Sequence, residues 1–124
     1  MKKLFILIIL VNIVFSSCKK EEKTYSVIYK IIEKSSRTPT YIARYSLPDG
    51  STQSVGSITK EFWVTDKIIN YKANSYLSLS VEGSGGGEYD LYIYINGTLA
   101  KTRPANDGFG PQKLEMEISN WLFS

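Results

Sequence analysis

The sequence predicts an all-β domain, an antiparallel sandwich of seven or eight short strands. Three observations lead to this prediction: apolar residues alternate with a period of two, turn signals separate the alternating runs, and no convincing helical period is present. Clean inward and outward alternation is typical of antiparallel sheets that are covered on one side only. We therefore expect two sheets that pack face to face around one core.

The first half of the expected sandwich contains two tyrosine-rich runs and a polar return strand. Residues 25–32 and 41–47 each place one set of side chains on a common face: Tyr25, Val27, Tyr29 and Ile31, then Tyr41, Ala43, Tyr45 and Leu47. Pro48, Asp49 and Gly50 predict a tight turn, because Pro presets φ and Gly accepts a positive φ. Residues 51–55 are then expected near a sheet edge, and the next apolar anchors are Ile58, Phe62 and Trp63.

The second half begins with a cleanly alternating run and ends with a hairpin. Residues 76–81 turn Leu77, Leu79 and Val81 inward, and the glycine-rich residues 82–88 predict a flexible loop. Residues 89–95 place Leu91, Ile93 and Ile95 on one face and Tyr92 and Tyr94 on the other. Asn96-Gly97 predicts a type I′ turn, which needs a positive φ at both central positions, and residues 98–102 form the return strand.

The last expected strand, residues 113–119, turns Leu114, Met116 and Ile118 to one side and Glu115 and Glu117 to the other. The closing residues 120–124 are expected either to add a strand or to pack Trp121 over the open end of the core.

Residues 1–17 are typical of a bacterial lipoprotein signal peptide. Lys2 and Lys3 precede the apolar run 4–15, which is shorter than the roughly 20 residues that a membrane-spanning helix needs. Ser16 and Ser17 stand directly before Cys18 and resemble a lipobox, the motif at which the chain is cleaved between Ser17 and Cys18 and Cys18 is linked to diacylglycerol. Phe15 stands where Leu is usual in that box. The alternative is an uncleaved anchor with a free thiol, which would be unusual in an oxidising compartment.

Residues 18–24 are expected to be the lipidated cysteine and a charged, solvated tether. The tether is similar to the short export signal that follows the cysteine in surface lipoproteins of Bacteroidota. Lys19 is not Asp, so the rule for retention in the inner membrane is not met. We therefore expect an outer-membrane lipoprotein, with the surface-exposed and periplasm-facing orientations both open.

Residues 25–124 are expected to form a single domain. Removal of residues 1–17 from the 124-residue chain leaves 107 residues, and the loss of Lys2 and Lys3 lowers the formal net charge from +3 to +1. No basic run interleaves with aromatic residues, so a nucleic-acid partner is not expected.

The chain offers little catalytic chemistry. It has no histidine, which excludes the usual general base near neutral pH, and its only cysteine is the expected lipid site. Glu115 and Glu117 share a strand face and fit a solvated edge, and residues 106–108 fit a plain turn better than a calcium site. We therefore expect no enzyme, no metal and no cofactor.

The best candidate binding face is formed by tyrosines. Tyr89, Tyr92 and Tyr94 crowd one strand, and Tyr92 and Tyr94 point away from its Leu-Ile face. Exposed tyrosines of this kind stack on sugars or contact a partner protein. The alternative is cross-strand packing that stiffens the sheet, or cover by a loop or by Trp121.

The order of motifs from about residue 25 to residue 102 resembles the extracytoplasmic domain of the MmpS family, the mycobacterial small membrane proteins. The matching segments are Ala43-Arg44-Tyr45, Asp49-Gly50, Gln53 and Val55, Phe62-Trp63, residues 77–80 and residues 93–97. The resemblance implies an immunoglobulin-like β-sandwich and an accessory role beside a lipid-exporting transporter. Two departures weaken the transporter role: an expected lipid replaces the family's uncleaved helix, and the cysteine pair near the end of many members is absent.

The sequence therefore favours a non-enzymatic, lipid-anchored interaction module of the cell envelope, accessory to a membrane transport or surface assembly. The alternative is a surface lipoprotein that binds glycan or lipid through the tyrosine face. The expected partners are the membrane, through the lipid on Cys18, and an envelope protein, a transporter or a glycan.

Overall fold

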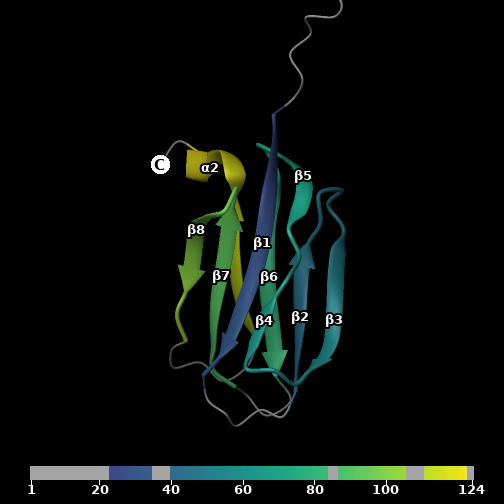
Figure 1. Cartoon of the computed structure of the whole chain (residues 1–124), viewed down its shortest axis with the longest axis vertical. Helices are drawn as coiled ribbons and strands as arrows, with labels where there is room; N and C mark the ends of the chain where they lie inside the picture. The colour runs from purple at the N-terminus through teal and green to yellow at the C-terminus, as the bar shows by residue number, and fades with distance from the viewer. Residues whose placement is uncertain (1–22, 35–39, 84–86, 106–110, 123–124) are drawn as a thin grey trace, which may run out of the picture.

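A computed structural model describes residues 23–34, 40–83, 87–105 and 111–122 and confirms the predicted antiparallel β-sandwich. Within these residues there are nine strands rather than seven or eight, and one short helix (Figure 1). They are β1 (Thr24–Glu33), β2 (Tyr41–Ser46), β3 (Thr52–Ile58), β4 (Phe62–Val64), β5 (Ile68–Lys72), β6 (Tyr76–Gly83), β7 (Tyr89–Ile95), β8 (Thr98–Arg103), β9 (Gln112–Glu117) and α2 (Ile118–Leu122).

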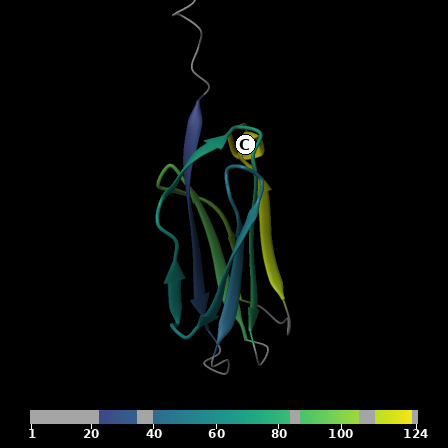
Figure 2. The same cartoon turned by 90° about the vertical axis from the view of Figure 1, so that its right-hand side faces the viewer.

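The strands form two sheets that face each other, as the edge-on view in Figure 2 shows. The front sheet, which faces the viewer in Figure 1, has the order β4-β1-β7-β8, and β5 also pairs with β1. The back sheet has the order β3-β2-β6-β9. All pairs are antiparallel, and the polar strand β3 lies at an edge, as predicted.

The alternation predicted from the sequence sets the core. Buried and half-buried residues alternate along β1, and β6 turns alternate residues inward in the same way. Side chains from both sheets form one cluster, whose largest fully buried members are Tyr29, Tyr71, Tyr89, Ile31, Leu77, Leu79, Leu91, Ile93, Ile95 and Ile118. Each such aliphatic side chain contributes about 1.5–3 kcal/mol on removal from water, so this cluster is the main stabilising feature of the fold.

The strand β5 was not predicted, because its alternation is broken. Both β4 and β5 pair with the same edge of β1, so they act as one strand interrupted at residues 65–67. At the interruption the backbone amide of Thr65 donates to the Tyr29 carbonyl (2.9 Å), and the Tyr29 amide donates to Thr65 Oγ1 (3.1 Å). A side-chain oxygen thus replaces a backbone carbonyl, and Asn70 adopts a φ of 75° farther along.

One of the three predicted apolar anchors is wrong. Ile58 is buried and Trp63 packs against the core, but Phe62 is 50% exposed. The reason is the register of β4, which pairs Trp63 with the inward residue Ile31 and Phe62 with the outward residue Ile32. Phe62 therefore lies on the outside of the front sheet.

The two predicted turns are confirmed. Asn96 and Gly97 have φ values of 50° and 81°, as a type I′ turn requires. Asn96 Oδ1 also accepts a hydrogen bond from the Ser26 amide (2.9 Å), which joins the hairpin to β1. Gly50 has a φ of 87°, and Asp49 Oδ1 accepts the amide of Ser51 (2.9 Å).

Trp121 packs against the core, as one of the two alternatives predicted. Residues 118–122 form the helix α2, so the predicted extra strand is wrong. Ile118 is buried, its amide donates to the Ser75 carbonyl (3.2 Å), and Trp121 is partly buried against the core.

The open corner between β8 and β9 is closed by two cationic side chains. Lys101 Nζ donates to the Glu115 carbonyl (2.7 Å), and Arg103 donates to the Lys113 carbonyl (2.8 Å). These bonds occupy backbone groups of an edge strand, which lowers its tendency to pair with another chain.

Candidate functional site

The predicted binding face included Tyr89, and this assignment is wrong. Tyr89 is fully buried and its ring packs on Tyr41, with the two ring centres 5.2 Å apart. The physical reason is strand parity: Tyr89 lies two residues before Leu91, so both point into the core. Tyr89 is a core residue of the front sheet.

Tyr92 and Tyr94 lie on the outside of the front sheet, as predicted. Both are half-buried, and their ring centres are 6.4 Å apart with 23° between the ring planes. Tyr92 stands opposite Lys30 on β1, and Tyr94 stands opposite Ile28. Cross-strand packing, the predicted alternative, therefore occurs as well, but it leaves part of each ring in contact with solvent.

Lys30 occupies the centre of this surface. Its Nζ atom lies 5.0 Å from the centre of the Phe62 ring and 5.2 Å from the centre of the Tyr92 ring. A cation over the face of an aromatic ring is attracted by the ring quadrupole, so both rings hold the ammonium group in place. No ion pair joins Lys30 to a carboxylate in the part of the chain that the structure describes.

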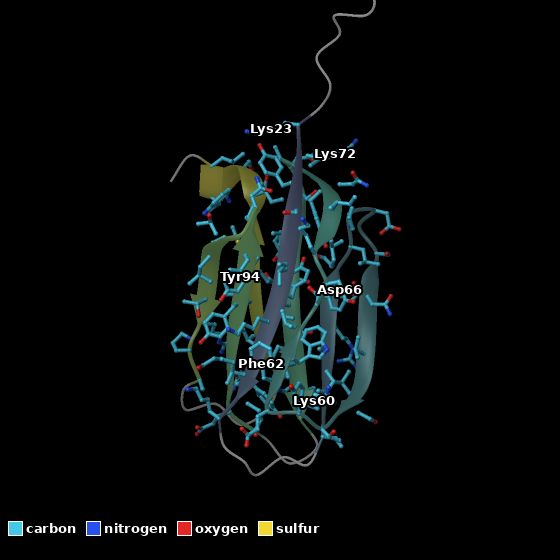
Figure 3. The ribbon with its side chains drawn as sticks, in the orientation of Figure 1. Lys23, Lys60, Phe62, Asp66, Lys72 and Tyr94 are labelled. Carbon is cyan, nitrogen blue, oxygen red and sulfur yellow. The ribbon has the colours of Figure 1, made fainter. Side chains whose placement is uncertain are left out.

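These residues belong to a larger apolar surface, the outer aromatic face. The register places its members on the same side of the front sheet: Ile28, Lys30, Ile32, Phe62, Val64, Tyr92, Tyr94 and Leu99. Phe62, Val64 and Leu99 are 50%, 44% and 45% exposed. Phe62 and Tyr94 are labelled on this side in Figure 3. Exposed apolar patches of this kind mark interaction sites more often than isolated exposed residues do.

Phe62, Lys30 and Leu99 belong to this face but were not predicted as members of it from the sequence. Parity along β1 was sufficient to place Lys30 outside, on the side opposite Tyr29 and Ile31. Phe62 and Leu99 needed the register of β4 and β8, which no local pattern provides.

Asp90 forms the acidic rim of the outer aromatic face. Its carboxylate accepts the amide of Ala105 (2.5 Å) and pairs with Lys34 (3.4 Å). The Tyr92 hydroxyl also donates to Asp90 (3.4 Å), and partial burial together with this carboxylate raises the pKa of Tyr92. Asp90 is thus engaged by its own neighbours and leaves Lys30 without a counter-charge.

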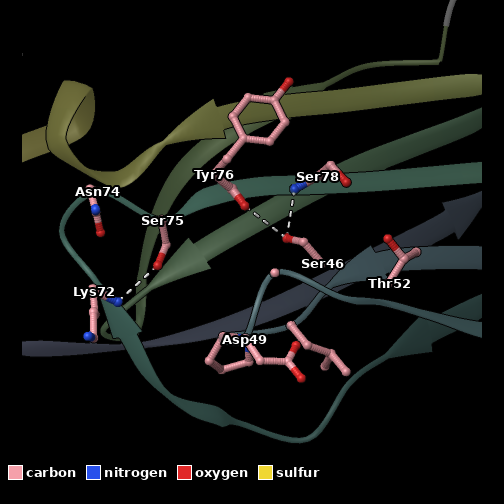
Figure 4. A pocket seen from close by; sticks show the side chains of 11 residues that line it. Ser46, Asp49, Thr52, Lys72, Asn74, Ser75, Tyr76 and Ser78 are labelled. Carbon is pink, nitrogen blue, oxygen red and sulfur yellow. Dashed lines mark hydrogen bonds between the residues drawn. The ribbon is translucent and has the colours of Figure 1, made fainter.

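A cavity of about 410 Å³ lies at the end of the sandwich, between the β2–β3 turn and the β5–β6 turn (Figure 4). Ser46 lines this cavity, and its side-chain oxygen and its carbonyl both take part in hydrogen bonds within the fold. Its Oγ accepts the amide of Ser78 (3.1 Å) and bonds the hydroxyl of Tyr29 (2.9 Å), and its carbonyl accepts the hydroxyl of Tyr71 (2.6 Å). Burial raises the pKa of both tyrosines, so neither is a base near neutral pH. This network is structural.

The predicted carboxylate pair lies on β9, beside a second cavity lined by Tyr76, Glu115, Glu117 and Trp121. Glu115 pairs with Lys113 (2.5 Å) and accepts the Tyr76 hydroxyl, and these bonds, that from Lys113 first, hold its pKa below the usual range. Glu117 accepts the hydroxyl of Ser119 (2.6 Å). An exposed, ionised carboxylate is a poor general acid.

The described residues contain no group of histidine, cysteine and acidic side chains that is suited to a metal ion. Their only helix is too short to cross a membrane. Ser17, Cys18 and residues 106–108 lie outside the described residues, as do residues 84–86 of the glycine-rich loop.

Comparison with models of known protein families and with curated proteins finds no match to this chain.

Proposed function

We propose that this chain is a non-enzymatic, lipid-anchored interaction domain of the bacterial cell envelope, which binds a partner protein through the outer aromatic face. The observation that carries the proposal is the exposure of Phe62, Val64 and Leu99 around the Tyr92–Tyr94 pair. Aromatic side chains are enriched at protein interfaces, because they bring a large contact area at a low entropic cost.

The shape of the surface supports a large partner. The two cavities described above are lined by residues outside the outer aromatic face. Small ligands bind in concave pockets that bury most of their surface, whereas a sheet face offers a broad contact area. A protein partner in a membrane transport or surface assembly suits such a face.

The position of the anchor supports the same function. The strand β1 begins at the end of the sandwich that carries α2 (Figure 1). A fully extended chain from Cys18 to Thr24 spans at most about 20 Å, so a lipid on Cys18 would hold this end near an outer-membrane surface. The outer aromatic face runs along the side of the sandwich and would stay open to a partner.

A second candidate function is glycan binding. The rings of Tyr92 and Tyr94 are nearly parallel, with 23° between their planes, and both are partly exposed. Two such rings in a row offer stacking surfaces to successive sugars of a polysaccharide.

The proposed function is tested by photocrosslinking in cells that express the full-length lipoprotein. Leu99→p-benzoylphenylalanine places the crosslinker on the outer aromatic face, and Gln53→p-benzoylphenylalanine places it on the exposed strand β3 as a control. We expect a discrete protein adduct from position 99 alone, which Cys18→Ser abolishes by releasing the domain from the membrane. Equal adducts from both positions, or none from position 99, would contradict a protein partner. Saturable binding on a glycan array that Tyr92→Ala removes would favour the second candidate.

A further inference from the structure

We infer that the partner presents a carboxylate to Lys30 from within an apolar surface. This inference rests on the proposed function and names the chemistry of the partner at the same face. It follows from the position of one unmatched charge at the centre of the outer aromatic face.

A partner that binds on the outer aromatic face removes water from Lys30. A partner that covers Phe62 and Tyr92 also covers the ammonium group of Lys30, because it lies 5.0 Å and 5.2 Å from their ring centres. Burial of an unpaired charge costs several kcal/mol, and contact with aromatic rings offsets part of this cost, about 2 kcal/mol or somewhat more. A partner that binds flat on this face must therefore supply the opposite charge.

Among the described residues, no carboxylate forms an ion pair with Lys30. Asp90 is the acidic residue that the register places on the same side of the sheet, diagonal to Lys30, and it is held by Lys34 and by the amide of Ala105. The Tyr92 hydroxyl donates a further hydrogen bond to Asp90. No carboxylate pairs with Lys30 within residues 23–34, 40–83, 87–105 and 111–122, so the inferred counter-charge comes from another molecule.

The charge of Lys30 disfavours a second copy of the chain as the occupant of this face. A two-fold symmetric contact presents the same surface from both partners. The outer aromatic face would then bring two Lys30 ammonium groups to one apolar surface without an available carboxylate. Like charges that are buried together disfavour such a contact, so the face selects a different molecule.

The apolar side chains around Lys30 favour a protein over an anionic polysaccharide. Isoleucine, valine, leucine and phenylalanine make up most of the face and cannot hydrogen-bond to sugar hydroxyls. A protein segment with one Asp or Glu between apolar side chains matches both the charge and the apolar surroundings. The partner is therefore a protein with an acidic anchor residue.

The test uses the position 99 crosslinker in the full-length lipoprotein in cells, combined with changes at Lys30. We expect Lys30→Gln to weaken adduct formation at least about tenfold, because the acidic anchor of the partner loses its counter-charge. Lys30→Arg should retain the adduct, and Lys60→Gln, which changes an exposed lysine in the loop before β4, should leave it unaffected (Figure 3). The peptide of the partner that carries the crosslink should contain Asp or Glu. A change of that acidic residue to Lys should weaken adduct formation, and Lys30→Glu should restore it.

The outcomes separate the inference from the proposed function. An adduct that Lys30→Gln and Lys30→Arg leave equally strong would overturn the acidic anchor while the protein partner stands. The absence of any adduct from position 99 would overturn both. Binding of polygalacturonic acid to the lipoprotein that depends on Lys30, without a protein adduct, would replace the protein by an anionic polysaccharide and overturn the inference.

Discussion

Two groups of tyrosines on the front sheet differ in direction and in what they contact. Tyr29 and Tyr71 point inward, and both hydroxyls bond to Ser46 of the back sheet. Tyr92 and Tyr94 point outward, and their rings are stacked and partly exposed. The comparison shows that a tyrosine-rich sequence does not itself define a binding surface, because strand parity assigns one set to the core and leaves the other for a partner.

The largest effect on stability is expected when one of the buried tyrosines is removed. Tyr71→Ala removes a fully buried ring together with the bond to the Ser46 carbonyl, so we expect a loss of about 3–5 kcal/mol in the free energy of unfolding. Tyr94→Ala, the matched change on the outer face, should cost less than about 1 kcal/mol. Urea denaturation of both variants provides the measurement. Similar losses from the two changes would mean that the outer tyrosines are also structural.

Parity was predictable from the sequence, and it placed most of the core correctly. The runs at residues 25–32, 76–81 and 89–95 show a period of two that local reading can follow, and the Asn96-Gly97 turn has a clear sequence signature. The inward position of Tyr89 followed from the same parity and was overlooked because the tyrosines of this strand were grouped by type.

Register could not be predicted in the same way. Strand β5 breaks its alternation at Asn70, and its pairing with β1 shifts between Tyr25 and Val27. The outward position of Phe62 depends on its pairing with Ile32, thirty residues earlier in the chain. Such long-range pairings depend on the whole sandwich, so the position of Phe62 beside Lys30 came from the structure alone, whereas the outward position of Tyr92 was predicted.

A smaller effect is expected at the bond network that distinguishes the inner tyrosines. Ser46→Ala removes the Oγ atom that accepts the amide of Ser78 and bonds the hydroxyl of Tyr29, whereas the bond from Tyr29 to the Ser46 carbonyl stays, so we expect a cost of about 1–3 kcal/mol, mainly from the Ser78 amide. Ser54→Ala, on the exposed strand β3, is the control and should be near neutral. Thermal denaturation of the two variants would measure the difference. A loss of stability no larger than that of Ser54→Ala would show that water readily replaces these bonds.

The smallest effect on stability near neutral pH is expected at Tyr41. Measurements at several pH values can test whether its hydroxyl is buried and neutral. Burial raises the pKa of Tyr41 to about 12, and its hydroxyl donates to the Lys60 carbonyl (2.7 Å). Tyr41→Phe keeps the ring and loses this bond, so we expect a loss of about 1 kcal/mol at pH 8.

At higher pH the stabilising contribution of Tyr41 becomes smaller. The unfolded chain ionises Tyr41 near pH 10, whereas the folded chain holds its proton to about pH 12, so the stability that the neutral hydroxyl brings is lost as the pH rises between these values. Phenylalanine has no such proton to lose, and the stability gap between the parent and Tyr41→Phe should therefore narrow from pH 8 to pH 11. Urea denaturation at several pH values would follow this gap, and a constant difference would contradict a buried, neutral Tyr41. Tyr92 lies on the outer aromatic face, where less burial opposes the ionisation of its hydroxyl. The stability gap between the parent and Tyr92→Phe should therefore depend less on pH than the gap for Tyr41→Phe, which would distinguish outer from buried tyrosines in solution.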